Sequence, residues 1–526
     1  MTLRRISIVL KADILALAIC LIALGTTAVI ARDILEGIPH VQDSVAYLFQ
    51  AKIFALGRFY APLPLFPQFF RHEFILQEGG KWFSKYPPGW PLVLAIGVIV
   101  GLPWVVNPLL AAFTLFLIYL LGKEFYSPRI GLLAAFLGLS SPFFLFLSAS
   151  FMSHPAALFF LTLFILTLIR GIRKGSQLYL LVSGLSWGMA FITRELTALA
   201  ITFPFTLYAL LDLVRRRSLR QYLPLVWGAL IPLSFYLLYN AILMGDPLLR
   251  PFSVHRPWDR LGFGPGIGNL GRFTPADGLE NVKDNLRVLR SHLFGWPPVF
   301  TLAFIPVPFL LGSRRLGDYL LLGGFLSLVL AYFFYWAHGI MFGPRYYYEA
   351  LPMLLLLTAG GIESLVQLCQ LIIPKMWVRL PLPSRWASTV AALPVAALLT
   401  ALLFSNLIVY LPVQLQVYHG YNFTSAKSLQ VVARSGVKHA IVFIESNPEW
   451  QWWKYGAVFP ANSPLLDTDI IYARDLGGLN QALMTLYPER CYYLLKGTHL
   501  TKIQPESDSE EEEFWRGGRS RKGVAE

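Results

Sequence analysis

The feature that most constrains this chain is a series of apolar runs, many of them about 17 to 25 residues long, which is the length that an α-helix needs to cross a bilayer. Composition agrees, because 56% of the 526 residues are hydrophobic and only 14% are charged. Soluble proteins carry roughly 25% charged residues. We therefore expect an all-α polytopic membrane protein with about 11–13 transmembrane helices.

The formal net charge of +14 does not indicate nucleic-acid binding, because most Lys and Arg residues fall in loops beside apolar runs, as membrane topology requires. The three cysteines lie far apart without metal-ligand spacing, so neither a disulfide framework nor a zinc site is expected. Residues 6–30 follow Arg4 and Arg5 and lack a small-residue cleavage box. We interpret them as a retained first span that starts inside.

The distribution of positive residues predicts the orientation of the spans. Short loops rich in Lys and Arg stay on the cytoplasmic side, so we place five loops there together with the N-terminus: residues 123–129, 170–174, 215–220, 314–315 and 375–385. The segments between them then form up-down pairs. Their tips lie on the extracytoplasmic side and comprise residues 153–155, 193–195, 245–297 and 343–346.

Two long segments are expected outside the membrane within a transmembrane domain that covers residues 1–412. The first external loop comprises residues 31–104, because residues 91–103 are apolar but too short to cross the bilayer. If they did cross, every later loop would lie on the opposite side of the membrane, and the Lys/Arg-rich loops would no longer be cytoplasmic. The second large external loop comprises residues 245–297.

After the last span the sequence changes to that of a small soluble domain, and we expect an extracytoplasmic α/β domain over residues 413–500. The segments with strand patterns are residues 439–444, 470–474 and 491–496, and those with helix patterns are residues 424–434 and 475–486. The acidic and Gly/Arg-rich residues 501–526 have the composition of a disordered tail. The domain is expected to have an accessory role, in acceptor binding or in covering the active site.

Polar residues near the membrane surface are the candidates for chemistry, since each one is costly there. Asp43 follows the first span and precedes an amphipathic helical stretch over residues 45–56. A carboxylate at the start of a helix is either a cap or a functional group, and position alone favours the cap. The first external loop closes in the rigid Lys-Tyr-Pro-Pro-Gly segment at residues 85–89, which is also typical of a membrane-interface belt.

The order of these elements resembles the GT-C superfamily of integral membrane glycosyltransferases, which use polyprenyl-phosphate sugars. The shared features are an acidic residue after the first span, a long external loop closing in a Tyr-Pro-Pro-Gly turn, and polar tips on the same side. The chain is most similar to the protein O-mannosyltransferase and aminoarabinose transferase type, including bacterial relatives. The resemblance covers residues 5–365 and implies a membrane-embedded sugar transferase.

The resemblance also implies roles for individual residues. Asp43 matches the catalytic aspartate, whereas the following position, often acidic in relatives, is Ser44. Arg194 and Arg345 match cations that meet the lipid phosphate, and Lys85 is a further phosphate candidate. The remaining candidates, for substrate binding, are His154, Glu195, Tyr346, Tyr86, His72 and Glu73.

These residue types suit the implied reaction. A departing polyprenyl phosphate develops negative charge that arginine stabilises, and a carboxylate can accept the proton of an acceptor hydroxyl. One displacement at the anomeric carbon would invert its configuration. On this basis we interpret Asp43 as the catalytic base rather than a cap, an interpretation that depends on the resemblance.

Several alternatives remain open. The chain could be a transporter or flippase for lipid-linked glycans, which would place ionisable residues at mid-membrane, or an inactive GT-C-like scaffold, given Ser44. No cofactor is certain, although a divalent metal site remains open for His40, His72, Glu73 and His154 with Asp43. Glu195 could simply pair with its neighbour Arg194. The aromatic cluster of Trp450, Trp452, Trp453 and Tyr455 is either a carbohydrate-stacking surface or a packed core.

We expect a multi-pass protein of a bacterial plasma (inner) membrane whose active site and C-terminal domain are extracytoplasmic. The expected partners are a polyprenyl-phosphate-linked sugar, an acceptor glycan, lipid or protein, and the surrounding membrane lipids.

Overall fold

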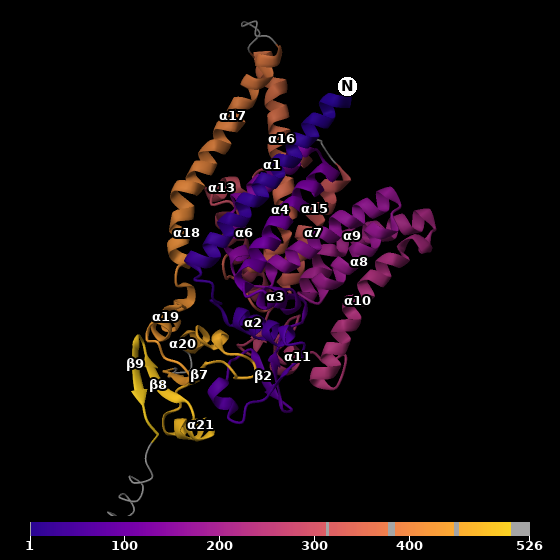
Figure 1. Ribbon diagram of the computed structural model, residues 1–526. Helices are drawn as coiled ribbons and strands as arrows, with labels where there is room; N and C mark the ends of the chain where they lie inside the picture. The colour runs from indigo at the N-terminus through magenta and orange to yellow at the C-terminus, as the bar shows by residue number, and fades with distance from the viewer. Residues whose placement is uncertain (1, 312–314, 377–383, 446–451, 506–526) are drawn as a thin grey trace, which may run out of the picture.

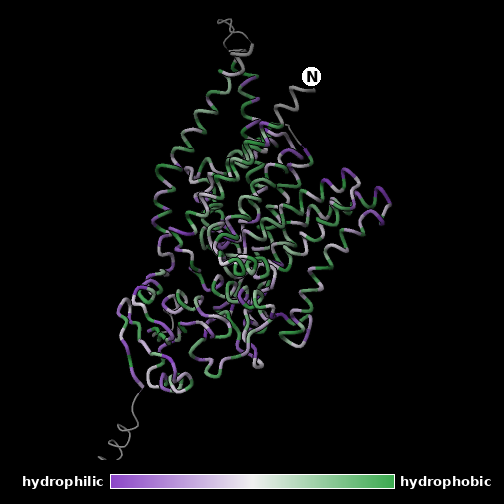
Figure 2. Tube along the Cα trace, viewed as in Figure 1, coloured by the Kyte–Doolittle hydropathy of each residue, from purple (hydrophilic) through white to green (hydrophobic). Residues whose placement is uncertain are grey.

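The computed structural model describes residues 2–311, 315–376, 384–445 and 452–505. A bundle of long helices forms most of the molecule, and a small sheet-containing unit packs at the end opposite the N-terminus (Figure 1). Hydrophobic residues dominate the bundle, whereas hydrophilic residues gather in the C-terminal unit and in turns between long helices (Figure 2). Most of the predicted disordered tail lies outside the described residues.

The bundle is built from helices that follow the predicted apolar runs. They are α1 (Thr2–Val29), α4 (Val106–Phe125), α5 (Pro128–Leu139), α6 (Pro142–Ala149), α7 (His154–Lys174), α8 (Gln177–Phe191), α9 (Glu195–Arg216), α10 (Leu219–Met244), α15 (Leu316–Phe333), α16 (Leu351–Met376) and α17 (Ser384–Phe404), which continues through η5 (Ser405–Tyr410) into α18 (Leu411–Tyr418). The helix α1 continues into a five-residue π-helix, η1 (Ile30–Ile34).

The predicted class, an all-α polytopic membrane protein, is confirmed, but fewer helices than expected are long enough to span. In the described part of the chain eight segments are long and apolar enough, or nine if the bent pair α5 and α6 is one span. The helix α8 has only 15 residues, although it packs against α7 and α10. The region after Pro297 breaks into α13 (Pro298–Thr301) and α14 (Val307–Leu310), because prolines interrupt it.

The segment between α1 and α4 does not span. It contains α2 (Gln42–Ala55), a three-stranded antiparallel sheet and α3 (Gly89–Ile99). In this sheet β3 (Lys81–Ser84) pairs with both β1 (Ala61–Pro62) and β2 (Ile75–Glu78). The apolar stretch before Pro103 forms α3, a helix of 11 residues, whereas a crossing needs about 20.

The segment between α10 and α13 folds into short elements that cover the same end of the bundle. These are α11 (Pro251–His255), the hairpin of β4 (Gly264–Pro265) and β5 (Arg272–Phe273), and α12 (Pro275–His292). A capping box formed by Thr274 and Asp277 starts α12 and satisfies free backbone N–H groups.

The C-terminal unit contains a four-stranded sheet in the order β7-β6-β8-β9. The three predicted strands are present as the parallel β6 (Ala440–Ile444), β7 (Ile470–Arg474) and β8 (Cys491–Lys496). The edge strand β9 (His499–Ile503) was not predicted, because its polar residues are exposed on both faces and lack an apolar alternation. The short helices α19 (Lys427–Arg434), α20 (Trp452–Gly456) and α21 (Asn480–Leu486) surround the sheet.

The C-terminal unit packs directly on α2. The Lys52 amine donates to the carbonyl oxygens of Pro460 and Asn462, the latter at 2.9 Å. The rings of Phe49 and Phe459 pack with centroids 5.5 Å apart. Burial lowers the pKa of Lys52 to about 8. The helix that carries Asp43 is therefore held on two sides, by the bundle and by the C-terminal unit.

The Pro-Pro-Gly turn lies against the tip between α8 and α9. The backbone N–H of Gly89 donates to the Ile192 carbonyl oxygen at 2.9 Å. A Cβ atom on residue 89 would lie 2.7 Å from that oxygen, so only glycine allows this approach. Two motifs about a hundred residues apart in the sequence are thereby brought together ahead of Arg194.

Candidate active site

Asp43 lies in the first turn of α2 but does not cap it. The N-cap residue is Val41, and no side chain makes a capping hydrogen bond there. The Asp43 carboxylate instead accepts a hydrogen bond from the Tyr86 hydroxyl at 2.6 Å, and the Arg345 Nη1 atom lies 3.7 Å from the same oxygen. The segment η4 (Arg345–Ala350) and the turn after β3 thus meet at the start of α2.

The environment of Asp43 keeps its carboxylate ionised. Burial alone would raise its pKa, but the Arg345 guanidinium, the Tyr86 hydroxyl and the Lys85 ammonium outweigh burial and hold the pKa of Asp43 below its ordinary value. The side chain is 16% exposed, so a small part of the anion remains accessible.

Lys85 is enclosed by aromatic rings. Its amine lies 3.7 Å from the Phe74 ring centroid and 4.7 Å from that of Phe252, which belongs to the segment after α10. Burial lowers the pKa of Lys85 to about 7, although the nearby Asp43 opposes this shift. The amine therefore changes protonation near neutral pH, and an anion placed beside it would favour the charged form.

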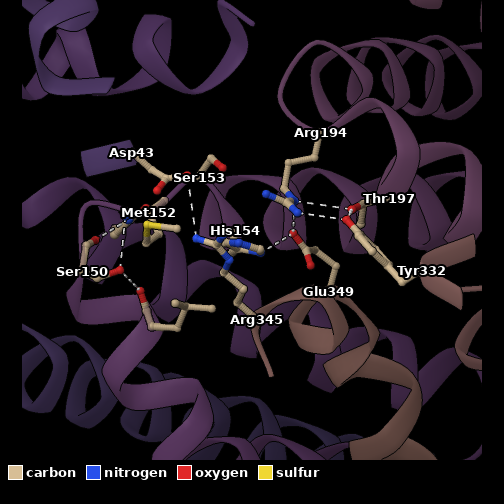
Figure 3. Close-up of polar contacts among 12 residues, drawn as sticks. Asp43, Ser150, Met152, Ser153, His154, Arg194, Thr197, Tyr332, Arg345 and Glu349 are labelled. Carbon is tan, nitrogen blue, oxygen red and sulfur yellow. Dashed lines mark hydrogen bonds and ion pairs between the residues drawn. The ribbon is translucent and has the colours of Figure 1, made fainter. Parts of the chain in front are cut away.

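Glu349 joins three segments that are distant in the sequence. Its Oε1 atom lies 3.0 Å from both the Nε atom of Arg194 and the Nδ1 atom of His154 (Figure 3). The side chains of His154 and Glu349 are fully buried. Because α7 begins at His154 and α9 directly follows Arg194, this carboxylate fixes the tips of both helix pairs against η4.

Arg194 and Arg345 differ in how many of their guanidinium N–H groups have hydrogen-bond partners. Arg194 is paired with Glu349 and also donates to the Tyr332 hydroxyl at 2.9 Å. The Arg345 side chain donates to the Met341 sulfur at 3.3 Å, hydrogen-bonds Tyr346, and makes a long contact of 3.7 Å with Asp43. Its Nε atom is buried without a hydrogen-bond partner in the described part of the chain. Arg345 is therefore the guanidinium with donor capacity left for a ligand.

Tyr346 connects the two arginines. Its ring stacks on Tyr332 with centroids 4.4 Å apart and planes 9° apart. The Arg194 and Arg345 guanidinium carbons lie 5.6 and 5.2 Å from the Tyr346 ring centroid. This packing holds both cations at the site.

The structure brings most of the predicted site residues together: Asp43, Lys85, Tyr86, His154, Arg194, Arg345 and Tyr346. Three others have different neighbours. Glu195 pairs with Arg250 rather than with Arg194, and also accepts from Tyr236. Glu73 pairs with Arg256. His72 stacks on Phe459 of the C-terminal unit, with ring centroids 5.6 Å apart.

The residues considered for a divalent metal do not form a site. In the described ranges no group of three or more His, Cys, Asp or Glu side chains could hold a metal ion. The Nδ1 atom of His40 lies 3.0 Å from the Ile38 carbonyl oxygen. Ser44, at the position that is often acidic in relatives, is buried and directs its hydroxyl at the Met152 sulfur.

Glu349 and Tyr332 are the main site residues that the sequence analysis did not identify. Glu349 immediately precedes the apolar run of α16, and a carboxylate at the edge of a span is itself a signal of function or pairing. Tyr332 lies in a run of aromatic residues at the end of α15, where nothing in the sequence distinguishes it from its neighbours.

Comparison with known proteins supports this fold. Residues 91–239 match the family model described as dolichyl-phosphate-mannose-protein mannosyltransferase. No curated protein matches the chain significantly.

The chain has the fold of the GT-C glycosyltransferases, which confirms the resemblance seen in the sequence. In particular, it is similar to ArnT from Cupriavidus metallidurans. The crystal structure of ArnT bound to undecaprenyl phosphate aligns with a TM-score of 0.56 at 12% identity, over 91% of this chain and 92% of that chain. The apo structure of ArnT aligns with a TM-score of 0.52 at 14% identity, over 95% and 91%.

Replacing Glu349 tests the buried network. We expect Glu349→Ala to destabilise the protein by about 3–5 kcal/mol, because it leaves a buried guanidinium unpaired. Glu349→Gln keeps a hydrogen-bond acceptor and should destabilise it less. Asp284→Ala, which removes an exposed pair with Arg287, is the control and should change stability by less than about 1 kcal/mol. Thermal unfolding in detergent measures all three, and equal effects would contradict a central role for Glu349.

Proposed function

We propose that the protein transfers a sugar from a polyprenyl-phosphate donor to an extracytoplasmic glycan, lipid or protein acceptor, with inversion at the anomeric carbon. The observation that carries this proposal is the Asp43 carboxylate, held ionised beside the incompletely satisfied Arg345 guanidinium. A base and a cation within 4 Å of each other are what this displacement needs, one for the acceptor proton and one for the leaving phosphate.

Arg345 and Lys85 are the proposed contacts of the donor phosphate. The Nε atom of Arg345 lacks a partner, and a guanidinium binds phosphate oxygens in a two-pronged geometry. Lys85 has a pKa of about 7, so an approaching phosphate would favour its protonated form. We assign Arg194 a positioning role, because its Nε atom pairs with Glu349 and its Nη2 atom donates to Tyr332.

Asp43 is the proposed general base. Its carboxylate would take the proton of the acceptor hydroxyl while the hydroxyl oxygen attacks the anomeric carbon and the bond to the phosphate oxygen breaks. Donor binding would assist this step, because a phosphate on Arg345 offsets part of the charge that lowers the pKa of Asp43. The Nε2 atom of His154 and the Oε2 atom of Glu349 are buried without partners in the described ranges, and suit hydroxyl groups of the donor sugar.

The site is proposed to face the extracytoplasmic side of a bacterial plasma membrane. The N-terminus, the end of α16 and the start of α17 lie at one end of the bundle, while α2 and the C-terminal unit lie at the other (Figure 1). The positive loops at residues 123–129 and 215–220 predict that the first of these ends is cytoplasmic.

The native cysteines test this orientation without new cysteine substitutions. Cys491 in β8 is exposed, whereas Cys20 is buried and Cys369 is half-buried within α16. We expect a membrane-impermeant maleimide to label intact spheroplasts at Cys491, and a Cys491→Ser variant to lose that label. Labelling of Cys491 only in inside-out vesicles would place the site in the cytoplasm.

Asp43→Asn tests the base. The amide cannot accept the proton, so transfer from a lipid-linked donor should fall by about 10² to 10⁴-fold, while undecaprenyl phosphate still binds. Retained binding, measured by the thermal shift that the lipid produces, separates a catalytic defect from misfolding. Asp33→Asn, on the preceding π-helix, is the matched control and should remain active. Full activity of Asp43→Asn would remove Asp43 as the base.

Tyr86→Phe tests the pH dependence. The Tyr86 hydrogen bond helps to lower the pKa of Asp43, so its loss raises that pKa. Because only the carboxylate form can act as the base, the acidic limb of the kcat/KM profile should move to higher pH. Tyr60→Phe, on a half-exposed residue of the first external loop, should leave that limb in place. A limb that stays fixed or moves to lower pH in Tyr86→Phe would contradict the proposed pairing.

A further inference from the structure

A cavity lies between the first external loop and the C-terminal unit. Its volume is about 210 Å³, and its walls include Gln42, Arg71 and His72 on one side and Trp452 and Arg474 on the other. Gln42 directly precedes Asp43, so the cavity reaches the start of the helix that carries the proposed base. The C-terminal unit thus supplies one wall of a pocket next to the site.

His72 is the most informative wall residue. Its side chain is 94% buried, and neither ring nitrogen has a hydrogen-bond partner among the described residues. Burial lowers its pKa to about 4, although the charge of Asp43 opposes this shift. A neutral imidazole offers one donor and one acceptor, which complements a ligand hydroxyl that can accept and donate in turn.

Trp452 presents an indole next to this imidazole. The ring packs over Gly456, where a Cβ atom would lie 2.9 Å from the indole Cε3 atom and 3.8 Å from the His72 Nε2 atom. Glycine at this position therefore allows the indole and the imidazole to face one cavity. An indole face provides the apolar surface on which the C–H face of a sugar ring packs.

Two arginines place positive charge on opposite walls of the cavity. Arg71 is exposed at its rim, and Arg474 lies at the end of β7. Glu73 also lines the cavity, but its carboxylate is paired with Arg256. A carboxylate or phosphate ester is the group that two guanidinium groups recognise.

We propose that this cavity is an acceptor subsite for an acidic sugar unit, in which Trp452 and His72 contact the ring and its hydroxyls while Arg71 and Arg474 bind the acidic group. The inference rests on the proposed function, because it assigns the cavity to the acceptor. Its position beside Gln42 would direct the next sugar of the acceptor towards Asp43. Acceptors would then be selected by the C-terminal unit and the reaction carried out in the bundle.

Sugar binding to the purified full chain in detergent tests this subsite, with D-glucuronate and D-glucose as probes in saturation-transfer NMR titrations. We expect glucuronate to bind about tenfold more tightly than glucose, as one additional charge-assisted contact implies. Arg71→Gln should remove this preference, and Trp452→Ala should weaken both sugars. The controls Arg287→Gln and Trp227→Leu change exposed residues away from the cavity and should leave both affinities unchanged.

Equal binding of the two sugars by the wild-type chain would overturn the proposal, as would a preference that survives Arg71→Gln. Competition by inorganic phosphate as strong as that by glucuronate would overturn the sugar part of it. The cavity variants should bind undecaprenyl phosphate like the wild type, so that a sugar preference lost in Arg71→Gln is assigned to the subsite and not to misfolding. Equal binding of the two sugars by a wild-type chain that still binds undecaprenyl phosphate counts against the subsite alone. Absence of both undecaprenyl phosphate binding and donor turnover in the wild type counts against the proposed function instead.

Discussion

A buried carboxylate holds the site together. Glu349 has no exposed surface, and its Oε1 atom lies 3.0 Å from both Arg194 and His154. A guanidinium in a poorly hydrated interior is costly without a paired anion, so the start of α7, the start of α9 and η4 must stay in contact. The segment η4 in turn carries Arg345 to Asp43. The positions of both proposed reacting groups therefore depend on an interaction that does not itself touch the reaction.

This arrangement divides the positive charges into two roles. Arg194 is neutralised by Glu349 and bonded to Tyr332, which suits it to positioning. Arg345 has a buried Nε atom without a partner in the described ranges, and its contact with Asp43 is 3.7 Å long. Lys85 adds an amine whose pKa of about 7 responds to nearby charge. The charge that a phosphate would meet thus lies on Arg345 and Lys85, the two cations that act on Asp43.

Sequence reasoning predicted the features that depend on local pattern. Apolar run lengths predicted the polytopic class, and the short apolar stretch before Pro103 predicted a non-spanning helix, found as α3. The strands β6, β7 and β8 followed from their apolar residues. Partners set by tertiary packing were not predictable: Glu195 pairs with Arg250, and Glu349, which pairs with Arg194, was not identified as a site residue. In the described ranges fewer segments than expected are long and apolar enough to span, because α8 and the segment after Pro297 are short or broken.

An experimental structure with undecaprenyl phosphate tests the central claim most directly. The account predicts phosphate density within hydrogen-bond distance of Arg345, on the side that faces Asp43 and Lys85, while the Arg194–Glu349 pair stays intact. Phosphate bound on the opposite side of Tyr346, or at the other end of the bundle with Asp43 and Arg345 unoccupied, would contradict it.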